Sequence, residues 1–340
     1  METKIKLMVL GAIQKERTPF SYEFKGLTDI EEDELFEDGC INFLPDEEQQ
    51  ISIFFDSYGC VSFSFNSPIE TLIARKVELK KFSEENIKWI KKTFYKNDKP
   101  NISDRDLVVL SGTNPERGND GWSVFLTARN KGLVPEEIAP FDLRNKDYSV
   151  NNKTNYYKYS RSKEAEEVAA EFKKRFEIKA EWVHCDYWAE ASKKGVLQVY
   201  TKAWFERDGK YYNPTPGKFG HAIQYAKHSE LKIFDSYDPF IKQMEKIEDF
   251  YPYALKINIF NKNMEKPKLE NNALILMVTG PGDVGLFLDG RIIKDNPALI
   301  LTTWIARNGK NDVFSGGLVK SITKEQWNLF DKTDLKGNKL

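Results

Sequence analysis

Helix-type segments come first in this 340-residue chain and strand-type segments come later, and this order restricts the fold more than any other feature. Five segments have the apolar spacing, caps or composition of helices: 60–76, 83–95, 103–110, 122–131 and 162–176. Short β-type runs separated by Gly-, Pro- and Asn-rich turns follow at 178–182, 196–205, 221–225 and 231–234. Such segregation predicts an α+β domain.

Composition changes again near residue 262, where a polar, lysine-rich link begins. Beyond it, the apolar runs 274–278, 286–293 and 299–306 have the character of strands. The sequence therefore predicts three parts, which are an N-terminal segment, a main domain and a small β-rich C-terminal module, at 1–45, 46–262 and 263–340.

Two local patterns in the first 76 residues each predict a particular local structure. The acidic run Asp29 to Asp38 predicts a solvated loop or short helix. The helix-type segment from Cys60 should present one apolar face, and Pro68 should kink or break it.

The bulk composition excludes several classes of protein. Hydrophobic residues make up 40% and aromatic residues 13%, as in a globular protein. A formal charge of −1 argues against a general nucleic-acid binder. No apolar stretch approaches the ~20 residues that span a bilayer, so we expect no membrane partner. Three cysteines without framework spacing favour a reducing compartment, and hence a cytoplasmic location.

Cys60 is the first candidate catalytic residue, because it follows a turn-type segment at the start of a predicted helix. A helix N-terminus and a nearby imidazolium both lower the pKa of a thiol and so favour its nucleophilic form. His221, on a later predicted strand, would act as the base, and Asp235, on the next strand, would orient the imidazole. The Cys60 N–H and the side chain of Gln50 or Gln49 would bind the oxyanion.

Segments around these residues resemble papain-like cysteine peptidases over roughly residues 46–245. The matching segments, in chain order, are Gly59-Cys60-Val61-Ser62-Phe63, Ile102 to Val108, Lys131 to Glu137 followed by Pro140-Phe141, Lys194 to Val199, Gly220-His221-Ala222-Ile223 and Asp235-Ser236-Tyr237. The resemblance implies a two-subdomain fold, with a helical half and an antiparallel β half, and a polypeptide substrate.

The same resemblance suggests residues around the substrate. Gly59 and Gly220 flank the proposed nucleophile and base, and Tyr237 takes the place of an aromatic residue that shields the histidine's partner from water. Trp188 is a further candidate for lining the cleft.

The chain also departs from the family's pattern. Val61 replaces the usual tryptophan, Asp235 replaces asparagine, and Phe54 lies near the expected position of the oxyanion glutamine. The Lys-, Asn- and Ile-rich composition without disulfides resembles uncharacterised papain-like proteins of bacteriophages and some bacteria. An alternative function is therefore a catalytically inactive papain-like protein of a phage assembly, which binds partners through residues 263–340. A third candidate function is that of another cysteine acyl-transferase, such as a transglutaminase.

Two other motifs are interpreted as non-functional. His184, Cys185 and Asp186 are adjacent on a predicted strand, where neighbours point to opposite faces and cannot share a metal ion. The glycine pattern at 280–285 is followed by a second strand and not a helix, which indicates a hairpin turn. The sequence predicts no metal and no cofactor.

Overall fold

The computed structural model describes residues 33–52, 54–141, 152–202, 204–213 and 219–262, together with the backbone of five short strands beyond residue 273. The chain divides into two compact units; the described residues 33–262 belong to the first, and the described strands beyond residue 273 belong to the second. Each unit is described by itself.

The first unit contains the five predicted helices close to their expected positions, and two further helices, Lys153–Tyr157 and Trp188–Lys194, that were not predicted. They are α1 (Cys60–Glu78), α2 (Glu84–Phe94), α3 (Asp104–Leu110), α4 (Gly121–Lys131), α5 (Lys153–Tyr157), α6 (Lys163–Arg175) and α7 (Trp188–Lys194), with the 3-10 helices η1 (Ile41–Phe43), η2 (Cys185–Tyr187) and η3 (Ile247–Asp249). Ser83, Ser103 and Ser162 cap three of these helices by accepting a backbone N–H three residues further on. Gly132, at φ 75°, ends α4.

The strands of this unit form one large sheet and two short hairpins. They are β1 (Tyr95–Lys96), β2 (Lys99–Pro100), β3 (Phe176–His184), β4 (Val196–Thr201), β5 (Phe205–Arg207), β6 (Lys210–Tyr212), β7 (His221–Lys227), β8 (Lys232–Phe234), β9 (Ile241–Gln243) and β10 (Tyr253–Asn261). The six-stranded sheet has the order β3-β10-β4-β7-β8-β9, and its neighbouring strands are antiparallel. The predicted α+β fold with an antiparallel β half is confirmed.

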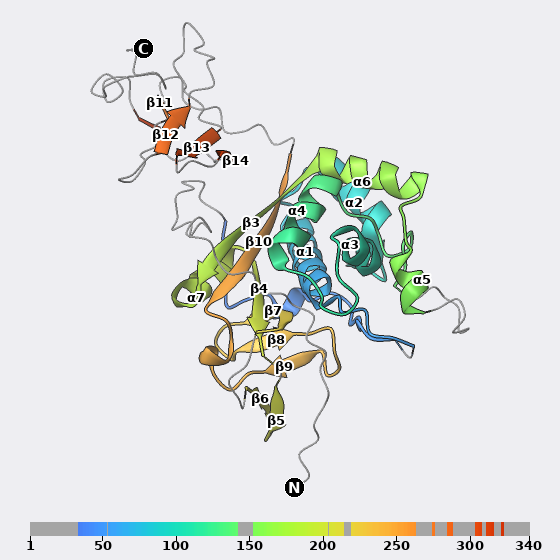
Figure 1. Cartoon of the computed structure of the whole chain (residues 1–340), viewed down its shortest axis with the longest axis vertical. Coiled ribbons are helices and arrows are strands. Elements are labelled where there is room, and N and C mark those ends of the chain that lie inside the picture. The colour runs from blue at the N-terminus through green and yellow to red at the C-terminus, as the bar shows by residue number, and fades with distance from the viewer. Residues whose placement is uncertain are drawn as a thin grey trace, which may run out of the picture. The chain divides into compact units, whose positions relative to one another are not determined.

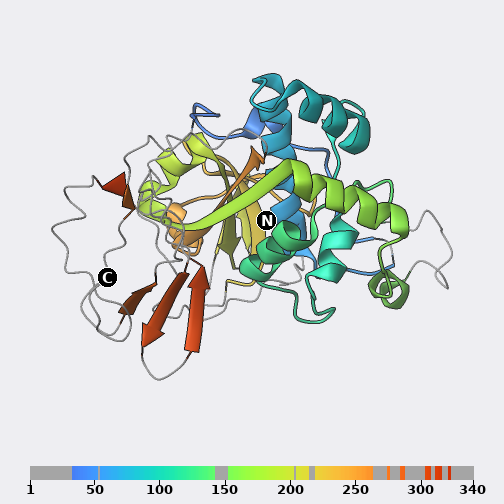
Figure 2. The ribbon, with the colours of Figure 1, turned by 90° about the horizontal axis from the view of Figure 1, so that it is seen from above.

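Helices and sheet are segregated in space as they are in sequence. Figure 1 shows α1 to α6 gathered on one side of the unit, with β4, β7, β8 and β9 beside them. Strand β3 follows α6 without a connecting loop, so one continuous segment joins the helical half to the sheet (Figures 1 and 2). Strand β10, absent from the prediction, pairs with β3 along its whole length and with β4 on its other side.

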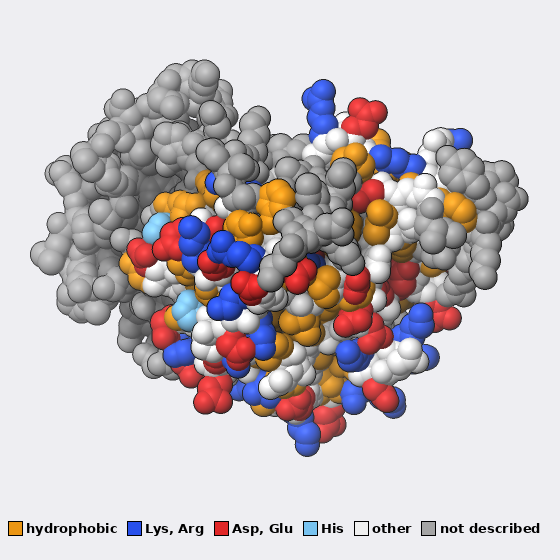
Figure 3. Space-filling view, turned by 90° about the horizontal axis from the view of Figure 1, so that it is seen from below, with side chains coloured by type: hydrophobic (Ala, Val, Ile, Leu, Met, Phe, Trp, Pro, Cys, Tyr) orange, Lys and Arg blue, Asp and Glu red, His pale blue; other side chains and the backbone are white. Residues whose placement is uncertain are grey.

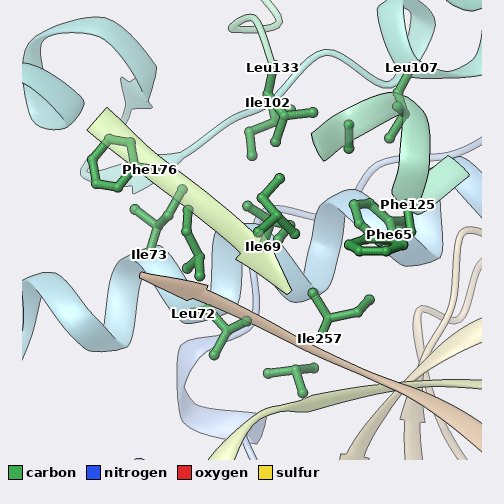
Figure 4. Packing of buried hydrophobic residues seen from close by; sticks show 14 of the residues in the cluster. Phe65, Ile69, Leu72, Ile73, Ile102, Leu107, Phe125, Leu133, Phe176 and Ile257 are labelled. Atoms are coloured by element: carbon green, nitrogen blue, oxygen red, sulfur yellow. The ribbon is translucent and has the colours of Figure 1, made fainter. Parts of the chain in front are cut away.

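Helix α1 is the central element of the fold. It packs against β7, β4 and β10 on one side and against α3 and α4 on the other. Figure 4 shows Phe65, Ile69, Leu72 and Ile73 among side chains from the sheet and the other helices. Fifteen of its 19 residues are buried, so the prediction of a single apolar face is wrong. Packing on several sides buries its polar residues as well.

Pro68 neither ends nor divides α1, so the break that was one of the two expected effects does not occur. The helix continues for ten residues beyond it, to Glu78. A proline inside a helix costs about 3 kcal/mol. Burial of the surrounding turns offsets this cost, because Phe65, Ile69, Leu72 and Ile73 are each fully buried.

The two faces of the sheet bury different apolar clusters. Val196 and Tyr200 of β4 belong to the cluster around α1, whereas Leu197 and Val199 belong to a second cluster with Trp188 of α7. This alternation follows from the period of two along a strand. The sheet is therefore covered on both faces.

The chain before α1 contributes to this core. Leu35 and Phe36 are buried, and their N–H groups donate to the carbonyl of Lys193. The expectation that the acidic run is wholly solvated is therefore wrong, since an apolar pair within it is anchored on α7. Cys40 is also buried in the main cluster.

The described part of the second unit consists of short antiparallel strands. β12 (Val284–Phe287), β13 (Thr303–Arg307) and β14 (Asn311–Ser315) form one sheet, and β11 (Leu274–Ile275) pairs with β15 (Ser321–Ile322). A strand thus follows the glycine pattern, as predicted, although residues 280–283 lie outside the described residues.

Surface charge is mixed on the face shown in Figure 3, where Lys and Arg side chains alternate with Asp and Glu. Within the described part of the chain, no helix combines the length and the apolar character needed to cross a membrane.

Candidate active site

The loop before α1 is shaped by its own side chains. Asp56 Oδ1 accepts the Tyr58 N–H at 2.7 Å, and Ser57 Oγ accepts the Gly59 N–H at 3.2 Å. Tyr58 adopts φ 55°, so the chain turns sharply before the helix. These contacts place Cys60 as the first residue of α1.

Gly59 is the N-cap of α1 and is required for close packing. A Cβ at this position would lie 2.6 Å from Cγ2 of Val108 and 2.9 Å from Oγ of Ser57. The structure thus gives Gly59 a packing role, and its proposed contact with substrate stays a prediction.

His221 and Asp235 meet across neighbouring strands. His221 begins β7 and Asp235 directly follows β8, which pairs with β7. His221 Nε2 lies 2.7 Å from Asp235 Oδ1, and both side chains are fully buried. The other ring nitrogen, Nδ1, is buried without a hydrogen bond of standard geometry to any described residue. Cys60 lies close enough to the ring to interact with it electrostatically.

The environment favours the charged form of His221. Burial alone would lower the pKa of His221, but the charge and hydrogen bond of Asp235 and the interaction with Cys60 outweigh it and raise the pKa from 6.5 to about 9. Burial likewise opposes ionisation of Asp235, yet His221 and Lys242 lower the pKa of that carboxyl below its ordinary value. The pair is therefore held as imidazolium and carboxylate.

Lys242, on β9, completes this arrangement and was not identified from the sequence. Its Nζ donates to Asp235 Oδ2 at 2.6 Å and to the carbonyls of Tyr237 and Pro239 at 2.6 and 2.5 Å. One carboxylate oxygen of Asp235 thus faces His221 and the other faces Lys242. The lysine fixes the rotation of the carboxylate and the loop that follows it.

Two aromatic rings enclose His221. The Tyr237 ring lies 5.5 Å from the imidazole centroid, and the Trp204 ring lies 5.3 Å away in an edge-on orientation. Tyr237 was predicted to lie at this place, whereas no role at the site was predicted for Trp204. Enclosure by aromatic rings excludes water from the His–Asp pair, which strengthens their electrostatic interaction.

Gln50 is close to this cluster, but its side chain is engaged elsewhere. Its Nε2 donates to Asp56 Oδ1 at 3.0 Å and to the Tyr237 hydroxyl at 2.8 Å, and its Oε1 accepts from Ser236 Oγ at 2.7 Å. Both amide hydrogens are therefore committed, and an oxyanion contact would require one of them to change partner. Gln49, the alternative, is exposed.

The predicted substrate contacts of Trp188 and Gly220 have different outcomes. Trp188 is fully buried, donates to the Val183 carbonyl at 3.1 Å and packs against Tyr225. Tyr225 lies four residues beyond His221 on β7, or about 13 Å along a strand. The prediction that Trp188 lines the cleft is therefore wrong, because it fills the core at the far end of that strand. Gly220 is buried directly before His221, and its substrate contact stays a prediction.

His184, Cys185 and Asp186 do not continue a strand, contrary to the premise used to exclude a shared metal. Strand β3 ends at His184, and the chain turns into the 3-10 helix η2. The turn gathers one ligand atom of each residue within 4.8 Å of the others.

Comparisons with known proteins give only distant likenesses. No family profile and no curated protein matches the chain. Among solved structures, xylellain, a cysteine protease from Xylella fastidiosa, is 14% identical at a TM-score of 0.39, over 65% of this chain and 90% of its own. Procathepsin L 3 from the Tenebrio molitor larval midgut is 13% identical at a TM-score of 0.39, over 73% of this chain and 76% of its own. A recombinant stem bromelain precursor is 13% identical at a TM-score of 0.35, over 66% of this chain and 73% of its own. These TM-scores are too low to establish a shared fold, and the fold class given above rests on the chain's own elements.

Proposed function

We propose that the chain is a papain-like cysteine peptidase that cleaves polypeptides through an acyl-enzyme on Cys60. The observation that carries the proposal is the buried contact of 2.7 Å between His221 Nε2 and Asp235 Oδ1, which leaves Nδ1 without a hydrogen bond of standard geometry while Cys60 interacts with the imidazole. An acid that holds one imidazole nitrogen while the other faces a thiol is the arrangement required for nucleophilic catalysis.

The raised pKa of His221 favours the form in which the proton of the Cys60 thiol has already passed to the imidazole, and from this ion pair the sulfur attacks the peptide carbonyl carbon. The resulting oxyanion is stabilised by the Cys60 N–H, one of the first N–H groups of α1, which have no partner within the helix. The imidazolium then protonates the leaving amine as the C–N bond breaks. Water attacks the thioester while one of its protons moves to His221, and cleavage of the C–S bond releases the carboxylic acid and restores the starting pair of Cys60 sulfur and protonated His221.

A second candidate is a papain-like scaffold without turnover, with residues 263–340 contributing protein contacts. Burial of the site residues favours this scaffold function, because both Cys60 and His221 are 0% exposed. A substrate reaches Cys60 only if neighbouring residues move.

Alkylation with iodoacetamide at pH 6, resolved by cysteine through peptide mass spectrometry, distinguishes the two candidates. Cys185 is partly exposed and serves as a reference thiol in the same molecule. A peptidase site predicts that Cys60 reacts faster than Cys185 and that His221→Ala removes this excess. Labelling of Cys60 that is slower than that of Cys185 would support the scaffold.

Cleavage of casein provides the matching activity test. Cys60→Ala should abolish cleavage, and the control Cys185→Ser should retain it. Because the pKa of His221 is raised to about 9, the imidazolium persists to that pH, and cleavage should decline above it. Incorporation of an amine without hydrolysis would indicate a transglutaminase-type reaction instead.

A further inference from the structure

We infer that His184, Cys185 and Asp186 form a site for a zinc-type divalent cation at the end of the β3–β10 pair. Three potential ligand atoms of different chemistry meet there. His184 Nδ1 lies 3.9 Å from Cys185 Sγ and 3.1 Å from Asp186 Oδ2, and Cys185 Sγ lies 4.0 Å from Asp186 Oδ1.

These separations are close to those of a tetrahedral zinc site. With Zn–S near 2.3 Å and Zn–N or Zn–O near 2.0–2.1 Å, tetrahedral angles place neighbouring ligand atoms about 3.3–3.6 Å apart. The observed separations are within about half an ångström of these values, but the two contacts of Asp186 are made by different carboxylate oxygens, and one ligand atom of each residue lies within 4.8 Å of the others. Rotation of the Asp186 carboxylate would bring one oxygen to both partners, so that three ligand atoms form one face of a tetrahedron and water supplies the fourth ligand.

The turn that carries the ligands is anchored on both sides. His184 pairs with Tyr253 in the ladder, and their rings lie 4.9 Å apart. The Cys185 N–H donates to the Pro252 carbonyl at 2.7 Å. After the turn, the buried Trp188 donates back to the Val183 carbonyl. Because backbone and core contacts set this geometry, a cation would not have to order the turn itself.

The donor set and the local charge both favour a borderline cation. Thiolate and imidazole select zinc over magnesium or calcium, which prefer oxygen ligands. The carboxylate of Asp186, one of the three proposed ligands, carries negative charge and adds attraction for a cation. The side chains of His184 and Asp186 are 34% and 74% exposed, so an ion can enter from solvent.

The existing contacts of the turn do not oppose this site. The Asp186 N–H reaches His184 Nδ1 only at 3.4 Å, and a bound ion would replace this weak contact and the His184–Asp186 pair. The inference is independent of the proposed function, since it uses neither Cys60 nor His221.

Cobalt titration of the full-length Cys60→Ala protein tests the site and removes the nucleophile as a competing thiol. We expect one cobalt ion per chain, with a thiolate-to-cobalt charge-transfer band that zinc displaces. Cys185→Ser in the same background should abolish the band. Asp186→Asn should weaken binding at least about tenfold. Asp208→Asn, a matched change at an exposed turn, should have no effect.

Two results would overturn the inference. One is a Cys60→Ala protein that gives no charge-transfer band with cobalt. The other is a band of equal strength after Cys185→Ser, which would place the ion elsewhere. Thermal unfolding provides an independent readout, because zinc should raise the Tm of the Cys60→Ala protein but not that of its Cys185→Ser derivative.

Discussion

At the scale of single residues, the His221–Asp235 contact depends on a third charge. Asp235 is fully buried, and a buried carboxylate is stable only when it is paired and hydrogen-bonded. Lys242, whose side chain is 1% exposed, supplies that pairing and also binds two carbonyls of the following loop. Lys242 is therefore a positioning residue, since it acts on Cys60 only through Asp235 and His221.

Lys242→Met is expected to reduce both stability and thiol reactivity. Removing one partner of a buried ion pair leaves an uncompensated charge and costs about 3–5 kcal/mol. Loss of the cation also weakens ionisation of Asp235, so the excess labelling of Cys60 at pH 6 should fall. Denaturant unfolding and the alkylation rate measure the two effects.

Lys246→Met is the matched control, because Lys246 is exposed and lies four residues further along the chain. Lys246→Met should change neither the free energy of unfolding nor the rate of Cys60 labelling. If Lys242→Met lowers stability but leaves the Cys60 labelling rate unchanged, Lys242 is structural only and its positioning role is wrong.

At the scale of elements, local sequence accounts for most helix boundaries. Serine caps begin α2, α3 and α6 at the predicted places, because a serine oxygen satisfies an N–H that has no partner within the helix. The caps differ in their tertiary contacts. Ser103 is 1% exposed and also donates to the Ala139 carbonyl, whereas Ser162 is exposed and only caps.

This difference predicts that replacing serine by alanine lowers the free energy of unfolding by unequal amounts at the two positions. Ser162→Ala should cost about 1 kcal/mol, the usual value of a cap. Ser103→Ala should cost about 2–3 kcal/mol, because it also leaves a carbonyl of the buried Ala139 without its donor. Urea unfolding of both variants measures the difference. Equal costs would mean that the contact with Ala139 contributes nothing to stability.

At the scale of the whole first unit, distant segments bring four carboxyl groups into one buried cluster. They are Glu48 before α1, Glu70 on α1, Asp104 on α3 and Glu136 after α4. Burial, followed by their mutual repulsion, raises the pKa of Glu70 and Asp104. A small cavity lined by three of these acids also reaches Asp235 and Ser236, so the cluster borders the candidate active site.

This cluster should make stability depend on pH. For a group with a raised folded-state pKa, the stabilising contribution is complete below the unfolded value of 4.5 and is lost as pH rises through the folded value. Glu70→Gln removes one charge from the cluster, while its amide oxygen can still accept the Ile102 N–H. The variant should therefore lose less stability than the wild type between pH 5 and pH 8.

Unfolding free energies across that range measure the effect. Glu84→Gln, at the exposed start of α2, is the control and should retain the wild-type slope. A slope unchanged by Glu70→Gln would mean that this carboxyl does not titrate in the folded protein within the range.

Local patterns in the amino-acid sequence were enough to predict the α+β class, the capped helix starts and the position of Cys60 in the first turn of a helix. Each of these follows from contacts within a few residues or from apolar spacing. The sequence also paired His221 with Asp235, because it assigns them to consecutive predicted strands.

The contact partners of those residues, in contrast, depend on the three-dimensional fold. Lys242 reaches Asp235, Trp204 packs on His221, and Gln50 is committed to Asp56 and Tyr237. Pro68 is accommodated, and α1 is buried on several sides, because the sheet and helices enclose it. These contacts depend on burial and on pairing between distant segments. The spacing of residues along the chain does not indicate which distant side chains will be buried together.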